Sequence, residues 1–455
     1  MIQMRKKKFW KILTIWINGK EGDYIMNMLI IGNGFDLAHK LPTSYKDFLK
    51  FVEEVQDFVE FRKVAKNMAR SKKYFNFLLE FSTTKSGIKC ISDICNFSKD
   101  NLWIDYFNRY LNDDNLSFKE NWIDFELEIS KFVQVLDSMN KSKNHCIKND
   151  YEIFINNNYS FKAKTSDVSF LENLYPNLIK NHHASFFLAE NKKGYLIELT
   201  FFNNLKKQLT NDLNYLIRCL EIYLSCYINT LNNKIRIKEI DELSSNINYV
   251  LSFNYTNTYE RLYGNNKDVK YDYIHGKADL NHSLESCSLV LGIDEYLDET
   301  EKNENIDFIQ FKKYFQRIYK KTGCEYINLL EDLNESLNIY IFGHSLDITD
   351  KDVLHKLITN SSSKTTIYYH DDDSYKKQIA NLVRVLSQDV LIDSVYGKNP
   401  RIKFVKQKKV KESEEKSIVE SEIKEVSTIA AHNDHLKDPD EKEKILDDFN
   451  DIDEW

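Results

Sequence analysis

Short apolar runs alternate with helix-spaced apolar stripes along the second half of the chain, and one further run stands near its start. Each run has the length of a buried strand and is rich in apolar or β-branched residues. The runs stand at Met28–Ile31, Ile247–Phe253, Tyr271–His275, Ser288–Gly292, Asn338–Phe342 and Thr366–His370. Helical patterns over Asp307–Tyr319 and Asp350–Ile358 separate several of them. Because strands that alternate with helices usually form parallel sheets, we predict an α/β fold.

A helical periodicity dominates residues 45–240, between the first run and the second. Apolar side chains recur there at three- and four-residue steps, which is typical of helices that bury one face. The clearest series are Tyr45, Phe48, Val52, Val55 and Val59, and then Leu205, Leu209, Leu213, Leu216, Leu220, Tyr223 and Tyr227. The second series predicts a long helix over 202–231. We therefore predict a mainly helical insertion at residues 45–240, which separates residues 26–44 from residues 241–405 of one α/β domain.

The two ends of the chain differ from the rest. Residues 1–25 contain a short apolar stretch after three lysines, but Lys11 interrupts it and no small-residue cleavage site follows, so a signal peptide is disfavoured. We expect a non-native or flexible extension there, with the native start at Met26 or Met28. Residues 406–455 are blocks of like charge, which predict a flexible, solvated tail. No segment approaches the roughly 18 uninterrupted apolar residues of a membrane span.

Composition narrows the classes of function. A net charge of −7 over 455 residues argues against a protein that coats DNA, and no motif points directly to nucleic acid. The seven cysteines are scattered without a Cys-x-x-Cys pair. This pattern disfavours a zinc site or a disulfide framework and fits a reducing cytoplasm, so we predict no metal and a cytoplasmic location.

A glycine turn follows the first strand. Gly32, Asn33, Gly34, Phe35 and Asp36 lead from the apolar run into a helical pattern. Glycine lets a ligand approach the backbone, and the start of a helix attracts a phosphate group. The third glycine of the dinucleotide fingerprint is missing. The turn therefore favours nucleotide binding, while an ordinary strand-to-helix turn stays open as the alternative.

Polar residues also follow the other predicted strands. Asn254, His275, Gly343, Ser345 and Asp347 stand at or just after strand ends. Because open parallel sheets bind ligands beyond the carboxyl ends of their strands, we expect these residues at one edge. Four of them have a plainer interpretation, with Asn254 as a helix cap, His275 in a hairpin, and Ser345 and Asp347 as N-caps. Their convergence favours a common site.

Six segments, in order along the chain, carry a family resemblance. They are MNMLIIGNGFDLAHKLPTSYKDF from residue 26, NWIDFE (Asn121–Glu126), LSFNYTNTYE (Leu251–Glu260), YIHGK (Tyr273–Lys277), LVLGID (Leu289–Asp294) and IYIFGHSLDITDKD (Ile339–Asp352). These segments resemble the AbiH family of bacterial abortive-infection proteins over nearly all of residues 26–400. The resemblance implies a role in defence against bacteriophage.

A more distant resemblance bears on the chemistry. The order of a glycine turn, an asparagine after a strand, His-Gly and Gly-x-Ser-Leu is similar to that of the sirtuin-like NAD-binding fold. The resemblance implies a Rossmann-like sheet, with Asn254 and His275 as the catalytic pair. The residues that we expect to hold the dinucleotide are Gly32, Asn33, Gly34, Phe35, Asp36, Gly343, Ser345 and Asp347. The chain lacks the four-cysteine zinc module of the deacetylases, so NAD hydrolysis is favoured over lysine deacetylation.

The leading hypothesis is an NAD glycohydrolase that uses NAD as its substrate and needs no prosthetic group. Asn254 would orient the attacking water or a ribose hydroxyl, and His275 would act as general base. A carboxylate from Asp36, Asp124 or Glu126 would stabilise the oxocarbenium-like transition state. For Asp124 and Glu126, an exposed face of their helix is the alternative.

Two other hypotheses stay open. The first is a nucleotide-sensing module that binds without turnover, and the second is a metal-dependent nuclease built on the same carboxylates. We also weigh a homo-oligomer assembled through the insertion. The phage trigger is not identified by the sequence.

Overall fold

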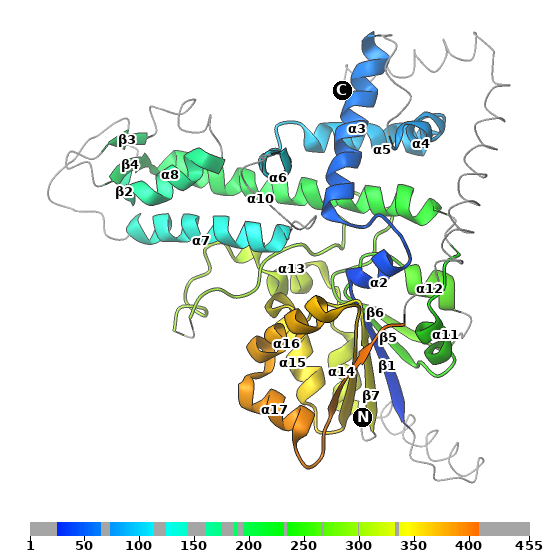
Figure 1. Ribbon diagram of the computed structural model, residues 1–455. Coiled ribbons are helices and arrows are strands. Elements are labelled where there is room, and N and C mark those ends of the chain that lie inside the picture. The colour runs from blue at the N-terminus through cyan, green and yellow to red at the C-terminus, as the bar shows by residue number, and fades with distance from the viewer. Residues whose placement is uncertain are drawn as a thin grey trace, which may run out of the picture.

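The computed structural model, drawn in Figure 1, describes residues 25–64, 73–112, 124–143, 160–174, 186–188, 194–231, 234–264, 268–298, 300–332 and 336–408. The predicted N-terminal extension up to residue 24 and the predicted tail from residue 409 lie outside these residues. Within the described part of the chain, no helix is both long and apolar enough to cross a membrane.

Six parallel strands form the central sheet. They are β1 (Met26–Ile31), β5 (Tyr249–Ser252), β6 (Lys270–Tyr273), β7 (Leu337–Phe342), β8 (Ser363–Tyr369) and β9 (Ile402–Lys406). Their order across the sheet is β6-β5-β1-β7-β8-β9. The chain therefore extends the sheet from β1 in one direction through β5 and β6, and in the other direction from β7 onward. At such a reversal, here between β1 and β7, open α/β sheets leave a crevice for ligands.

Helices cover both faces of this sheet. Met28 and Ile30 of β1 belong to one apolar cluster, while Leu29 and Ile31 belong to another, because successive residues of a strand face opposite sides. The helices on the Met28 side are α14 (Glu325–Asp332), α15 (Lys351–Thr359), α16 (Asp372–Leu386) and α17 (Gln388–Tyr396). Those on the Leu29 side are α2 (Asn33–Ala38), α11 (Lys238–Ser244) and α12 (Thr258–Tyr263). Burial on both faces explains the uninterrupted apolar run of β1.

Five of the six runs predicted as strands form strands. The prediction for Ser288–Gly292 is wrong. The side-chain amide of Gln316 bonds to the N–H and the carbonyl of Leu291 at 3.1 and 3.0 Å, so these backbone groups are satisfied without a neighbouring strand. β9, α16 and α17 were not predicted from the sequence.

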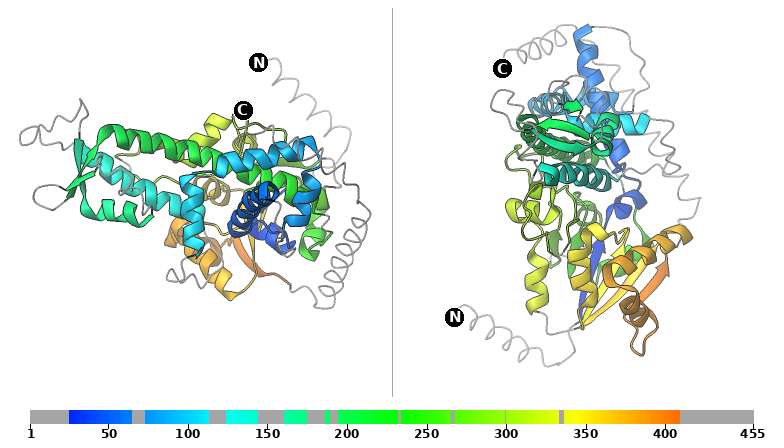
Figure 2. Two further views of the ribbon diagram at one scale, coloured as in Figure 1. Left: turned by 90° about the horizontal axis from the view of Figure 1, so that it is seen from above. Right: turned by 90° about the vertical axis from the view of Figure 1, so that its left-hand side faces the viewer.

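A mainly helical layer lies over the carboxyl end of the sheet (Figure 1, Figure 2). Its helices are α3 (Tyr45–Val64), α4 (Phe75–Phe81), α5 (Lys85–Ser98), α6 (Leu102–Asn112), α7 (Phe125–Lys143), α8 (Thr165–Leu174) and α10 (Leu199–Ile222). α10 continues as a π-helical turn over Tyr223–Tyr227. An antiparallel sheet that the sequence analysis did not predict joins β2 (Ser160–Lys164), β4 (Gly194–Glu198) and β3 (Phe186–Leu188) in that order.

The segment after β6 links the sheet to the helical layer. Its side chains Ala278, Leu289 and Phe311 belong to the same apolar cluster as Phe48 and Leu216 of that layer. The chain between β6 and β7 therefore contributes to the cores of both layers. The domain boundary placed at residue 240 stays a prediction.

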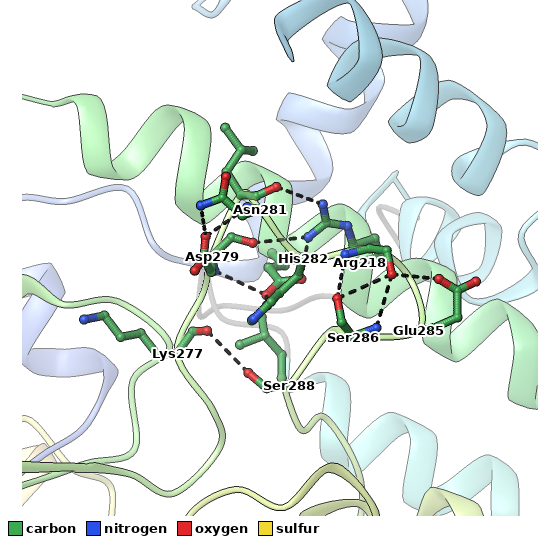
Figure 3. Close-up of polar contacts among 12 residues, drawn as sticks. Arg218, Lys277, Asp279, Asn281, His282, Glu285, Ser286 and Ser288 are labelled. Carbon is green, nitrogen blue, oxygen red and sulfur yellow. Dashed lines mark hydrogen bonds and ion pairs between the residues drawn. The ribbon is translucent and has the colours of Figure 1, made fainter.

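A buried polar network fixes this segment to α10 (Figure 3). Arg218 Nη1 donates to Glu221 Oε2 over 2.6 Å, and the two side chains are 4% and 0% exposed. Arg218 also donates to the carbonyls of Asp279 and Leu280, at 3.4 and 3.3 Å. His282 Nδ1 lies 2.5 Å from Glu221 Oε1. Glu221 is thus the anion on which the contacts of Arg218 and His282 depend.

Glu221→Ala is expected to lower the free energy of unfolding by about 3–5 kcal/mol, because it leaves the buried Arg218 charge without its carboxylate. Lys277→Ala is the control, since the Lys277–Glu260 pair is 41% and 40% exposed and such pairs contribute about 0–1 kcal/mol. Urea denaturation measures both changes. Equal losses for the two variants would contradict the role given to Glu221.

Candidate functional site

A cavity of about 590 Å³ opens where the carboxyl ends of the strands meet the helical layer. Nine of the ten predicted site residues line it. The exception is Phe35, whose ring packs in the core against Tyr259, Tyr263 and Phe342. The structure therefore brings the residues after β1, β5, β6 and β7 together, as the positions of the strand ends predicted.

The glycine turn after β1 packs against the turn after β7. Gly34 N donates to Gly343 O over 2.8 Å. A Cβ atom on Gly32 or on Gly34 would lie 2.8 Å from that same carbonyl oxygen, and Gly343 has a φ of +66°. The glycines are thus required for contact between two loops. The sequence pattern favoured ligand approach, with an ordinary strand-to-helix turn as the alternative, and did not predict this contact.

The other residues of the two turns are held by local bonds. Thr43 Oγ1 donates to Asn33 Oδ1 over 2.7 Å. Asp347 accepts a bond from Thr349 N and caps the short 3-10 helix Ile348–Asp350, as its plainer interpretation predicted. Ser345 is exposed, and its carbonyl accepts a bond from Asn381 Nδ2 over 2.9 Å. Both turns are therefore fixed before any ligand arrives.

Asn254 has a buried amide that contributes no cap. It is 5% exposed, and neither amide atom makes a well-aligned hydrogen bond within the described residues. α12 begins after Asn257, so Asn254 does not serve as its N-cap. Burial of an unpaired amide is costly. Since Asn254 lines the cavity, its amide is available to a ligand that offers both a donor and an acceptor.

Asp36 lies behind Asn254 and is 1% exposed. Thr256 Oγ1 donates to its Oδ2 over 2.6 Å, whereas Oδ1 has no hydrogen bond within the described part of the chain. Burial raises the pKa of Asp36 to about 6, although Thr256 and the nearby Asn254 amide favour the charged form. The carboxylate is therefore ionised near neutral pH at a cost in folding free energy.

His275 belongs to a chain of buried charges. Its Nε2 lies 3.2 Å from Asp350 Oδ1. The same oxygen accepts from Lys313 Nζ at 2.9 Å, and Lys313 reaches Glu126 Oε2 at 2.7 Å. Lys313 begins α13 (Lys313–Lys320), while Glu126 comes from α7 of the helical layer. No strand follows His275 directly, so the hairpin interpretation is wrong.

The titratable groups of this cluster have pKa values that are shifted in opposite directions. Burial raises the pKa of Glu126 to about 7, despite the Lys313 ammonium beside it. Burial alone would also raise the pKa of Asp350, but Lys313 and His275 outweigh it and hold that pKa well below its usual range. Burial and the Lys313 charge lower the pKa of His275. Near neutral pH the cluster therefore holds a neutral imidazole beside an anionic Asp350.

A second buried histidine faces the same carboxylate. His344 Nε2 lies 3.6 Å from Asp350 Oδ2, and burial lowers the pKa of His344 to about 4. The ring of Phe253 contacts both imidazoles, with centroid distances of 4.3 Å to His344 and 5.5 Å to His275. This apolar surface helps to keep both histidines neutral.

The helical layer forms one wall of the cavity. Tyr45, Asp124 and Glu126 line it, together with Leu220 and Leu224. The Glu126 side chain is 14% exposed, so the alternative of a solvated helix face is wrong for this residue. Asn121, Trp122 and Ile123 of the same motif lie outside the described residues.

The carboxylates of the nuclease hypothesis have other partners. Asp36 accepts from Thr256, and Glu126 pairs with Lys313. Across the described ranges, no group of three or more His, Cys, Asp and Glu side chains is arranged to hold a metal ion.

The sequence patterns predict no functional role for Lys313, His344 or Asp350. His344 follows Gly343 directly, and Asp350 precedes α15. Their positions next to a predicted strand end and a predicted helix start were therefore a signal that could have placed them at the site. Lys313 stands in an ordinary amphipathic pattern and had no such signal. Its role depends on two carboxylates that are distant in sequence.

Asp36→Asn is expected to gain stability relative to the wild type as the pH rises. The raised Asp36 pKa stabilises the fold below pH 3.8, and this contribution is lost as the pH passes through about 6. Between pH 4 and pH 7 the variant should gain most of about 3 kcal/mol, measured by urea denaturation. Asp373→Asn, at a carboxylate that is 92% exposed, is the control. A pH-independent difference for Asp36→Asn would show that Asp36 titrates normally.

Comparison with known proteins identifies the family. The model of the family described as "Bacteriophage abortive infection AbiH" matches residues 28–371, which include most of β1, the cavity residues up to His370 and the helical layer. Neither the curated proteins nor the solved structures give a match. The match spans most of the chain, so this protein belongs to the bacteriophage abortive-infection AbiH family.

Proposed function

We propose that this AbiH protein serves phage defence by binding NAD in the cavity and hydrolysing its nicotinamide–ribose bond. The observation that carries the proposal is the buried amide of Asn254, which makes no well-aligned hydrogen bond within the described residues, in one cavity with the His275–Asp350 pair. Family membership supports the defence role.

The topology supports a dinucleotide as ligand. Numbered along the chain, the strands of the sheet have the order 3-2-1-4-5-6, which is the order of dinucleotide-binding Rossmann sheets. The cavity adjoins the turns after β1 and β7, where the direction of sheet growth reverses. A Rossmann-like, sirtuin-like site would place the pyrophosphate near these turns and one ribose near Asn254.

The proposed reaction needs a water molecule and a base. The bond between ribose C1′ and the nicotinamide nitrogen breaks, and its electron pair stays on nicotinamide, which leaves as a neutral molecule. The oxygen of water bonds to C1′, so the products are nicotinamide, ADP-ribose and a proton. Asn254 is suited to orient the water or a ribose hydroxyl, because its amide both donates and accepts.

His275 is suited to take the proton. Asp350 lies beside Nε2 and favours the tautomer that carries its proton there. Nδ1 is then the acceptor for the proton of the attacking water. Asp36 is the carboxylate beside Asn254 and is the candidate to stabilise positive charge on the ribose. Glu126 is less suited to that task because Lys313 holds it.

The purified protein is expected to release nicotinamide from NAD, and chromatography measures the release. Asn254→Ala and His275→Ala should each lower the rate by about 10²-fold or more, as loss of a general base typically does. His355→Ala, at an exposed histidine on α15, is the matched control and should keep the wild-type rate. Unchanged activity in both site variants would refute the catalytic assignment.

The same assay separates the alternative functions. NAD hydrolysis by these residues needs no metal and should survive a chelator, whereas a nuclease built on carboxylates should need a divalent ion. Calorimetric binding of NAD with no nicotinamide release would favour the sensing module.

The pH profile tests the state of His275. The base must be neutral, so kcat/KM for NAD should be constant at neutral pH and fall as the pH drops through the lowered pKa of His275, with a midpoint below about 6.5. Asp350→Asn removes the charge that favours the imidazolium and should move the midpoint lower still. His355→Ala should leave the midpoint where it is. A wild-type midpoint above 6.5 would contradict the buried, neutral imidazole.

A further inference from the structure

A second buried amide lines the cavity, and one of its two polar atoms has no hydrogen bond within the described residues. Gln378 of α16 is 6% exposed and belongs to the cavity wall. Its Nε2 donates to the carbonyl of His344 at 3.2 Å and to the carbonyl of Tyr368 at 3.3 Å. Its Oε1 has no hydrogen bond within the described residues.

The two carbonyl partners fix the orientation of this amide. A carbonyl only accepts, so the nitrogen of Gln378 must face His344 and Tyr368, and the amide cannot turn over without losing both bonds. Oε1 is thereby left as a fixed acceptor. A buried acceptor without a partner costs free energy that a donor on a ligand would recover.

The surroundings of Oε1 indicate what kind of donor it meets. Tyr368 lines the cavity beside Gln378, and its ring is half-buried against Phe342 at a centroid distance of 5.8 Å. An aromatic side chain next to a lone acceptor suits a planar base with an amine on its edge. A ribose hydroxyl would suit the aromatic surface less well.

We propose that Gln378 accepts a hydrogen bond from the exocyclic amine of the adenine ring of the dinucleotide, and so selects adenine over bases with a carbonyl at that position. The inference rests on the proposed function for its ligand. It adds a specificity-determining residue in a part of the cavity that the hydrolysis mechanism does not use.

His344 connects this subsite with the proposed catalytic groups. Its carbonyl holds Gln378, whereas its imidazole lies 3.6 Å from Asp350. One residue therefore separates the adenine subsite from the carboxylate beside His275. A single dinucleotide would meet both parts of the cavity with its two ends.

The test compares NAD with nicotinamide hypoxanthine dinucleotide, in which a carbonyl replaces the adenine amine. The wild-type protein should hydrolyse NAD with a kcat/KM about tenfold higher, as expected for loss of one hydrogen bond against an unpaired acceptor. Gln378→Leu should bring the ratio close to one. Asn381→Leu is the matched control, because Asn381 also holds the loop after β7, through the Ser345 carbonyl. It should lower both rates and keep the ratio.

Each outcome is decisive. Equal kcat/KM for the two dinucleotides in the wild type would overturn the adenine assignment and leave NAD hydrolysis standing. A preference for NAD that persists in Gln378→Leu would place the discrimination elsewhere. If Gln378→Leu does not fold, the wild-type ratio decides alone. If calorimetry and nicotinamide release detect neither dinucleotide, the proposed function fails and this inference fails with it.

Discussion

The ammonium group of Lys313 is the constraint on which the site depends. It is 3% exposed and lies between Glu126 of the helical layer and Asp350 of the sheet domain. A buried charge is tolerated only when it is paired, and removal of one partner is far more costly than the pair is stabilising. Burial of Lys313 therefore requires both layers to be in place. Lys313 also holds Asp350, and Asp350 in turn positions the imidazole of His275.

Several polar groups in the cavity wall are buried on folding at a cost in free energy. Asn254, Asp36 and Gln378 each have a buried polar atom without a hydrogen bond within the described residues, and all three line the cavity. Folding alone would favour apolar side chains at these positions. Proteins accept such costs mainly at functional sites, where a ligand completes the missing bonds. The presence of three such side chains in the wall of one cavity is thus a structural argument for a ligand there.

The sequence predicted the parts of the fold that follow from local pattern. β1 and β7 are apolar runs buried on both faces, so their strands were visible, and the residues after them had to meet at one edge. β9 is a short edge strand in which two of the five residues are lysines, so it gave no such run. Ser288–Gly292 looked like a strand because it is apolar, but the distant Gln316 satisfies the backbone of Leu291. The pairing of Lys313 with Glu126 depends on docking of the two layers, which local pattern does not encode.

The opposed pKa shifts of Glu126 and Asp350 explain how Asp350 and His275 each keep one charge state near neutral pH. Both carboxylates touch Lys313, but only Asp350 also faces two imidazoles. A proton that enters the cluster therefore goes to Glu126, whose pKa burial raises to about 7, while Asp350 keeps its charge. Since Asp350 stays anionic and His275 stays neutral, the orientation of the imidazole does not change with the protonation of Glu126. The neutral state of His275 thus depends on charged groups from both layers of the protein. Neither layer alone could form this site.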